Sequence, residues 1–178
     1  MQTVQGETKT ITTTFNSKAT RNRLDLTSVQ EIRYCVVNGG NVVYKIYLPT
    51  TGNTVINVPT ITSIPSTADL FVGCPISGPG IPSGAKVLSI DSSTQVTMTL
   101  DGINSVNATS TNTAADYLFG DVEILTPTVL GQASLTLQTA DTTALGQGDA
   151  SIEAKVVIGG VTKYVLFKEP LSILAPYC

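Results

Sequence analysis

The residues able to carry out acid–base or metal chemistry are few in this chain of 178 residues, and histidine is absent. Without histidine there is no Ser-His catalytic pair, no imidazole metal ligand and no side chain whose ordinary pKa lies near neutrality. The usual means of hydrolytic and metal-assisted catalysis are therefore missing. The composition argues against an enzyme.

Acidic residues offer the remaining candidate chemistry. Asp116 with Asp121, or Asp141 with Asp149, could form a carboxylate pair or supply oxygen ligands to Ca²⁺. Each of these residues stands next to a turn signal, where an acidic side chain is commonly solvated. We expect solvated loop acids, and we predict no cofactor and no metal.

The three cysteines, Cys35, Cys74 and Cys178, lack the spacing of a metal site. The N-terminus has neither a basic start nor the apolar core of a signal peptide, so we expect synthesis in a cytoplasm, where disulfides are rare. Free thiols are the favoured prediction. A disulfide between Cys35 and Cys74 stays open.

Six aromatic residues could form a surface on which a sugar stacks, as an adhesin would need. At strand spacing, such residues more often belong to a core or to an interface between subunits. The candidates for interface or receptor contact are Tyr44, Tyr47, Tyr117, Phe119, Tyr164 and Phe167.

Several other classes of function are disfavoured. The net charge of −3 and the scarcity of clustered Lys and Arg argue against nucleic acid as a partner. No apolar run approaches the roughly 18 residues of a membrane span, so membrane insertion is not expected. The glycine-rich segment Gly78 to Gly84 is not followed by Lys-Ser or Lys-Thr, as a phosphate-binding loop would be, and we interpret it as a turn.

The elements that must position these residues are predicted to be strands. The chain is 42% hydrophobic and only 13% charged, and it is rich in β-branched residues, which suit a pleated sheet. Gly131 to Gln138 alternates apolar and polar residues, Ile152 to Ile158 resumes that alternation, and Gly159-Gly160 predicts a hairpin into Val161 to Phe167. Between them lies a segment that we interpret as a crossover between two sheets. In it, Asp141 can cap a turn by accepting backbone N–H bonds, and Leu145 is a single apolar anchor. The expected fold class is all-β with little helix.

Strands are also predicted near the N-terminus, over Thr8 to Phe15, Val29 to Val37 and Val42 to Leu48. Pro49 begins a segment dense in turn formers that extends to Gly120. We expect weak strands there, over 54–58, 70–72, 86–90 and 95–100, and a loop over 104–115. The predicted domains are residues 1–48 with 121–178, and an inserted β-rich subdomain, residues 49–120.

The order of features from Gly131 to Lys155 resembles the immunoglobulin-like β-sandwich of tailed-bacteriophage baseplate and tail proteins, typified by the N-terminal domain of the upper baseplate protein of lactococcal phages. The pattern is a glycine, an alternating strand, a Thr-x-Asp-Thr-x-x-Leu crossover, a second glycine and a strand with an acidic residue. The residues that carry it are Gly131, Leu135, Leu137, Thr139, Asp141, Thr142, Leu145, Gly148 and Glu153. Separately, Gly73 to Thr97 looks like a short β-hairpin element of phage virion and adhesin-like proteins.

The resemblance implies an immunoglobulin-like β-sandwich interrupted by a small β insertion. It also implies a non-enzymatic structural subunit of the virion, made in the host bacterial cytoplasm and located in the tail, baseplate or host-attachment apparatus. Its partners would be other virion proteins and a host-surface glycan. The strands expected over Val42 to Leu48 and Val161 to Phe167 bear apolar groups on both faces, so we also predict that one of these faces lies against another copy of the chain in a homo-oligomer. Two alternatives stay open, namely a capsid decoration or head-fibre protein and a stand-alone carbohydrate-binding module.

Overall fold

The computed structural model describes residues 1–17, 20–126 and 128–174, and for residues 163–169 within them the backbone alone. The chain divides into two compact units, Met1–Tyr47 with Asp121–Cys178, and Leu48–Gly120. These bounds lie within one residue of those expected from Pro49 and Gly120. Strands dominate both units, so the all-β fold class is confirmed. No helix in the described ranges has the length and apolar character needed to cross a membrane.

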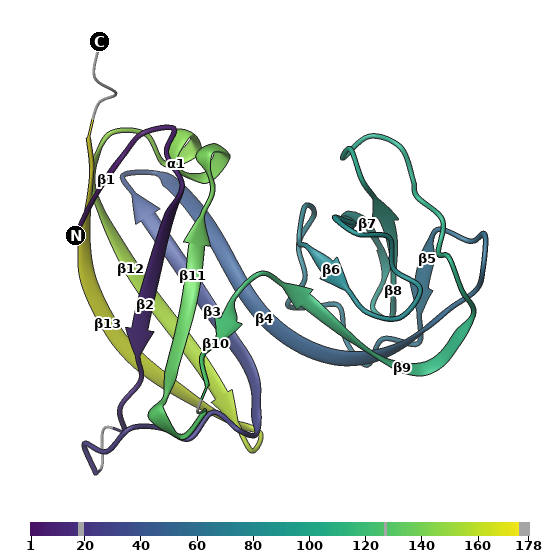
Figure 1. The fold of residues 1–178 in the computed structure, drawn as a ribbon, viewed down its shortest axis with the longest axis horizontal. Coiled ribbons are helices and arrows are strands. Elements are labelled where there is room, and N and C mark those ends of the chain that lie inside the picture. Colours follow the sequence, from purple (N-terminus) through teal and green to yellow (C-terminus); the bar gives the residue numbers. More distant parts are fainter. Residues whose placement is uncertain (18–19, 127, 175–178) are drawn as a thin grey trace. The chain divides into compact units, whose positions relative to one another are not determined.

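The first unit is a sandwich of two sheets (Figure 1). One sheet has the order β1-β13-β12-β3-β4, and the other has the order β10-β11-β2. The strands are β1 (Gln2–Val4), β2 (Lys9–Thr14), β3 (Val29–Asn38), β4 (Asn41–Thr54), β10 (Glu123–Ile124), β11 (Gln132–Leu137), β12 (Gly148–Ile158) and β13 (Val161–Leu174). A 3₁₀ turn, η1 (Thr128–Leu130), precedes β11, and helix α1 (Thr139–Leu145) follows it.

The core of the sandwich forms where the inward faces of the two sheets meet. The alternation of β11 buries Ala133, Leu135 and Leu137, while β3 buries Ile32, Tyr34 and Val36 from the opposite sheet. All residues of this core come from the first unit. The Tyr34 hydroxyl hydrogen-bonds to the Thr13 hydroxyl of β2, which satisfies a buried polar group. Burial raises the pKa of Tyr34, and the bond to Thr13 only partly opposes this.

The crossover from β11 to β12 joins the two sheets, as predicted. Its centre is the short helix α1 rather than an irregular turn. The Asp141 carboxylate accepts the backbone N–H of Gln138 at 2.7 Å, and Gln138 completes a capping box. Leu145 is buried in the core. The prediction that Asp141 caps this segment and Leu145 anchors it is confirmed.

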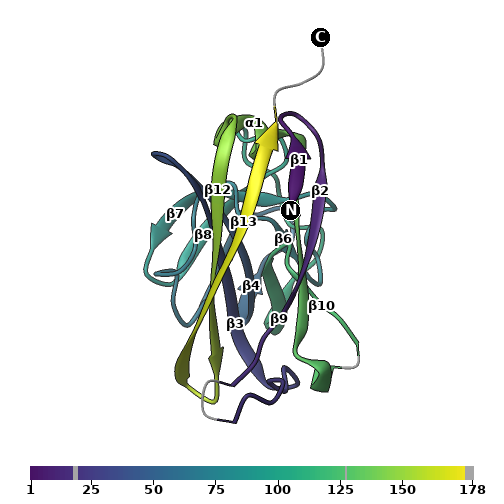
Figure 2. The ribbon, with the colours of Figure 1, turned by 90° about the vertical axis from the view of Figure 1, so that its left-hand side faces the viewer.

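Strand β1 lies beside β13 in a parallel arrangement (Figure 2). The register pairs Gln2 with Ser172 and Val4 with Leu174. Strand β13 continues through Pro170 to Leu174, so it is longer than the strand expected over 161–167. Gly159 and Gly160 both have positive φ, 59° and 71°, as a tight hairpin between β12 and β13 requires.

The second unit has its own small sheet, in which β5 (Thr60–Thr62) lies between β4 and β8 (Gln95–Thr99), and β7 (Lys86–Ser92) follows β8. Strand β9 (Asn112–Gly120) pairs with β6 (Ile76–Ser77) and with β4. A separate group of residues is buried here, including Ile61, Val96, Met98, Tyr117 and Phe119.

Three expectations for this unit are wrong. Residues 54–58 do not form a separate strand, because β4 runs through Pro49 to Thr54 and then turns. Pro49 lies between the residues paired with β3, ending at Tyr47, and those paired with β5, beginning at Asn53. Residues 70–72 lie in loop and turn, and the last part of the expected loop 104–115 belongs to β9.

Candidate interaction surface

The six aromatic candidates do not form one surface. Tyr44 is 46% exposed on β4, whereas Tyr47 is partly buried against the sandwich core. Tyr117 and Phe119 are 2% and 0% exposed in the second unit, so their proposed role in receptor contact is wrong. The side chains of Tyr164 and Phe167 lie outside the described part of the chain.

Tyr117 is buried because the glycine-rich turn packs on its ring. A Cβ atom at Gly78 would lie 2.5 Å from Tyr117 Cδ1, so only glycine fits at this position. The Tyr117 hydroxyl hydrogen-bonds to Thr54 at 3.1 Å. The segment Gly78 to Gly84 is followed by strand β7 and not by a helix, in agreement with its interpretation as a turn.

Tyr44 belongs to the outer face of the larger sheet of the sandwich. The register places Tyr44 opposite Cys35 of β3, and Cys35 opposite Glu153 of β12. The neighbouring row on the same face contains Val42, which is 43% exposed, and Val37. Val42 and Tyr44 thus form an exposed apolar strip along β4, next to Val37 and Cys35 of β3.

Charged residues continue this outer face beyond Cys35. Glu31 of β3 is only 5% exposed and is held by Lys155 Nζ at 2.9 Å and Arg33 Nε at 3.2 Å. Arg33 approaches the buried Glu31 Oε1 without good hydrogen-bond geometry, and no other described residue bonds that atom. Glu31 and Glu153 together balance Arg33 and Lys155, so this part of the face has no net charge. The alternation of Glu31 and Arg33 in the sequence was the signal for this cluster.

A shallow hollow of about 130 Å³ opens on this face, lined by Arg33, Cys35, Glu153, Ala154 and Lys155. Sites for small organic molecules usually measure about 300 Å³ or more. The hollow is therefore of a size to receive a single protruding side chain rather than a whole ligand.

Cys35 is the residue with a thiol among those that line the hollow. Burial raises the pKa of the Cys35 thiol, the charge of Glu153 raises it further, and Arg33 only partly offsets these effects. A thiol with a raised pKa stays protonated near neutral pH and is a poor nucleophile. Cys35 and Cys74 are both free thiols, as favoured from the sequence, and Cys178 lies outside the described residues.

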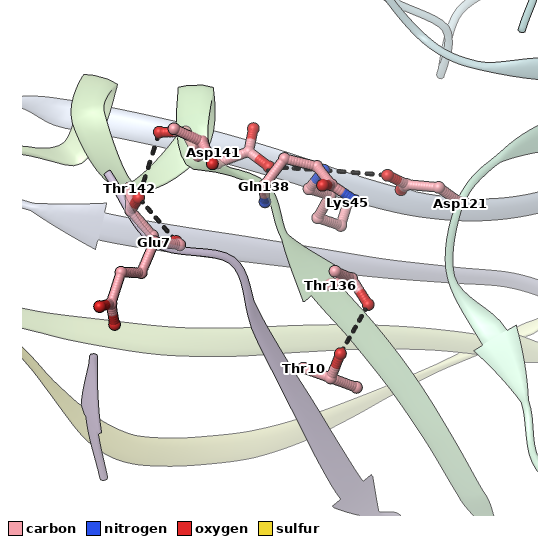
Figure 3. A network of polar contacts seen from close by, with 9 residues as sticks. Glu7, Thr10, Lys45, Asp121, Thr136, Gln138, Asp141 and Thr142 are labelled. Atoms are coloured by element: carbon pink, nitrogen blue, oxygen red, sulfur yellow. Dashed lines mark hydrogen bonds and ion pairs between the residues drawn. The ribbon is translucent and has the colours of Figure 1, made fainter. Parts of the chain in front are cut away.

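Lys45 forms a second polar cluster, which sequence reasoning did not identify. Its ammonium group lies 2.9 Å from Asp121 Oδ2 and 2.8 Å from Asp141 Oδ2 (Figure 3). Burial opposes the charge of Lys45, but hydrogen bonds and charge interactions with Asp141 and Asp121 outweigh it and raise the pKa of Lys45. The cluster ties β4, α1 and the segment before β10 together within the first unit.

The other two acidic candidates lie outside this cluster. Asp149 accepts a hydrogen bond from the Ser172 hydroxyl at 2.8 Å, and Asp116 belongs to the second unit. Asp121 and Asp141 both form an ion pair with Lys45, so these two residues are not the solvated loop acids that we expected from the sequence. Over the described ranges, no group of three or more acidic or cysteine side chains is placed to hold a metal ion.

Comparisons with protein-family models, with curated proteins and with solved structures found no match to this chain.

Proposed function

We propose that this protein is a non-enzymatic structural subunit of a tailed-phage virion, located in the tail, baseplate or host-attachment apparatus. Its first unit would be an immunoglobulin-like sandwich that docks through sheet edges and its outer apolar strip. The second unit would supply a further contact surface.

The observation that carries the proposal is the position of the residues that bear the phage resemblance. A Cβ atom at Gly131 would lie 2.6 Å from the carbonyl oxygen of Leu24, and Gly131 has φ +62°. Leu135, Leu137 and Leu145 are buried in the core, and Asp141 caps α1. These residues therefore build the closing half of the sandwich, which is the part that the resemblance describes.

The outer face of the larger sheet supports docking rather than catalysis. An exposed apolar strip, Val42 with Tyr44, borders a hollow of side-chain size whose thiol is held protonated. Such a face stabilises association by removing apolar area from water, and its balanced charges do not repel a partner.

Size-exclusion chromatography with light scattering tests the assembly part of the proposal. We expect a defined oligomer at micromolar concentration, which weakens when Val42→Thr and Tyr44→Ser are combined. Val161→Thr is the control, because Val161 is also exposed but lies at the β12–β13 hairpin. A wild-type protein that stays monomeric would contradict the proposal.

The carbohydrate-binding alternative is supported by Tyr44, the one exposed aromatic side chain among the described residues. A glycan array distinguishes the two functions. Glycan binding that is lost on Tyr44→Ala would favour the binding module, whereas detection of the chain in purified phage particles without glycan binding would favour the structural subunit. Tyr117→Ala is unsuitable for this test because Tyr117 is a core residue.

A further inference from the structure

The edges of the sheets differ in how they are protected. An edge strand presents unpaired backbone N–H and C=O groups to any chain that can pair with them. Proteins usually block such edges with short strands, bulges, lysines or prolines. The distribution of these features over the described strands indicates which edge is open to a partner.

Most edges carry at least one protective feature. Strand β10 has two residues, and β7 has two register shifts against β8. Strand β13 is paired with β1 over residues 172–174. The rest of β13 contains Lys163, Lys168 and Pro170 and has a register shift against β12.

Strand β2 lacks these features. It pairs with β11 in an unbroken register of six residues, and in the described part of the chain no other strand is hydrogen-bonded to it. It contains no proline, and its single charged residue, Lys9, is its first residue. Thr10 and Thr12 are exposed on the outer face. Strand β2 is therefore a regular and unprotected edge.

The hydrogen bond of Phe15, which follows β2, indicates to which side each residue of β2 directs its backbone N–H and C=O groups. Phe15 donates its N–H to the carbonyl of Gly131, on the β11 side, at 2.8 Å. In an antiparallel sheet, successive residues direct their backbone groups to opposite sides. Thr10, Thr12 and Thr14 therefore direct their N–H and C=O groups to the free side.

We propose that β2 pairs antiparallel with β2 of a second copy of this chain, about a two-fold axis at Thr12. This inference deepens the self-assembly part of the proposed function and rests on it. Thr12 then faces its own equivalent, and Thr10 faces the second copy's Thr14. All three are hydrogen-bonded pairs, because residues 10, 12 and 14 present their backbone groups to the same side. The three-stranded sheets join into one sheet of six strands.

The side chains and charges suit this pairing. Each hydrogen-bonded pair places threonine opposite threonine on the outer face, a combination that stabilises neighbouring strands. Lys9 faces Phe15 of the second copy, so the two Lys9 residues lie at opposite ends of the paired strands, roughly 20 Å apart at about 3.3 Å per residue. Charges at that separation are largely screened at physiological ionic strength. A two-fold axis at Thr12 thus brings no like charges together.

Substitution of Thr12 tests the hydrogen bonds at the axis. Thr12→Pro removes an N–H that has no partner within its own chain, so the fold should be kept and circular dichroism should be unchanged. Thr12→Ala keeps the N–H and is the matched control. By analytical ultracentrifugation, we expect dimerisation to weaken by about thirtyfold in Thr12→Pro, for two lost hydrogen bonds, and to change little in Thr12→Ala.

Disulfide trapping tests the register. Hydrogen-bonded antiparallel pairs have Cα atoms about 5.5 Å apart, which a disulfide can span. An oxidised mixture of Thr10→Cys and Thr14→Cys should give a mixed dimer on non-reducing gels, whereas Thr10→Cys alone should give no more dimer than the wild type with its native cysteines.

The two tests separate this inference from the proposed function. An oligomeric wild type in which Thr12→Pro has no effect and the mixed disulfide does not form would overturn the β2 interface and leave self-assembly standing. A wild type that does not associate at all would overturn both.

Discussion

At the scale of single residues, Gly131 shows how a sequence motif becomes a steric requirement. Its positive φ is unfavourable for other residues, and the backbone carbonyls of Leu24 and Phe15 occupy the space that a side chain would need. Gly159 has a similar φ of +59° but open space around it. Substitutions at Gly131 and Gly159 can therefore distinguish the free-energy cost of an unfavourable backbone conformation from the cost of steric overlap.

We predict that Gly131→Ala lowers the free energy of unfolding by about 2–5 kcal/mol, because backbone strain and overpacking add. Gly159→Ala should lower the free energy of unfolding by only about 1 kcal/mol, because it introduces backbone strain without overpacking. Urea denaturation of both variants measures the difference. Equal costs would show that the sandwich relaxes around residue 131.

The sequence predicted the structural roles of several glycine, leucine and aspartate residues of the sandwich. It did not predict which aromatic residues are exposed. Tyr44 and Tyr117 both lie on strands, and alternation alone does not tell whether a strand is covered on one face or on both. Tyr117 is buried because a turn almost 40 residues earlier, at Gly78, packs on its ring. The partners of Lys45 are likewise distant in sequence, and such contacts leave no local signal.

At the scale of elements, α1 is held by its neighbours more than by its own length. It has seven residues, too few to be stable alone. Thr142 is fully buried, and its hydroxyl accepts the N–H of Gly6 at 3.0 Å and lies 3.0 Å from the carbonyl of Glu7. The Thr142 side chain therefore joins the link from β1 to β2 to the crossover at two points.

We predict that Thr142→Val destabilises the protein by about 1–3 kcal/mol, because it keeps the shape of the side chain but leaves the N–H of Gly6 without its partner. Thr143→Val, at the exposed neighbouring position, should change stability by no more than about 0.5 kcal/mol. Thermal unfolding of the pair compares them. A similar melting temperature for both variants would mean that water replaces the hydroxyl.

The strands of the sandwich were largely predictable because each follows a regular alternation. The boundaries of β4 were not, since Pro49 usually ends a strand and here lies between two pairing segments. The helical form of the crossover was also missed, because seven residues are too short for a clear periodicity. Strand pairing decides the length of β4, whereas the capping box and the contacts of Thr142 hold the helical turn of the crossover.

At the scale of the whole molecule, the first unit has a complete core of its own. Every residue of that core belongs to Met1–Tyr47 or to the part after Gly120. The excursion Leu48–Gly120 contributes none of them, although it interrupts the unit in sequence. A core made without the insertion should not need the insertion to fold.

We therefore predict that replacing Leu48–Gly120 by a flexible Gly/Ser linker leaves a soluble unit with native-like circular dichroism and one cooperative unfolding transition. The control is the full chain, measured in the same buffer. A shortened chain that aggregates or melts without cooperativity would show that the second unit is required for the first to fold.

The parallel pairing of β1 with β13 has a mechanical consequence. The two strands run in the same direction side by side, and the bonds Ser172 N–H to Met1 O and Gln5 N–H to Leu174 O close the two ends of the pair. A force that pulls Met1 and Leu174 in opposite directions acts along both strands and loads these bonds together. Rupture then requires shearing the whole pair at once rather than opening it bond by bond. The sandwich is thereby built to carry tension between its two terminal strands.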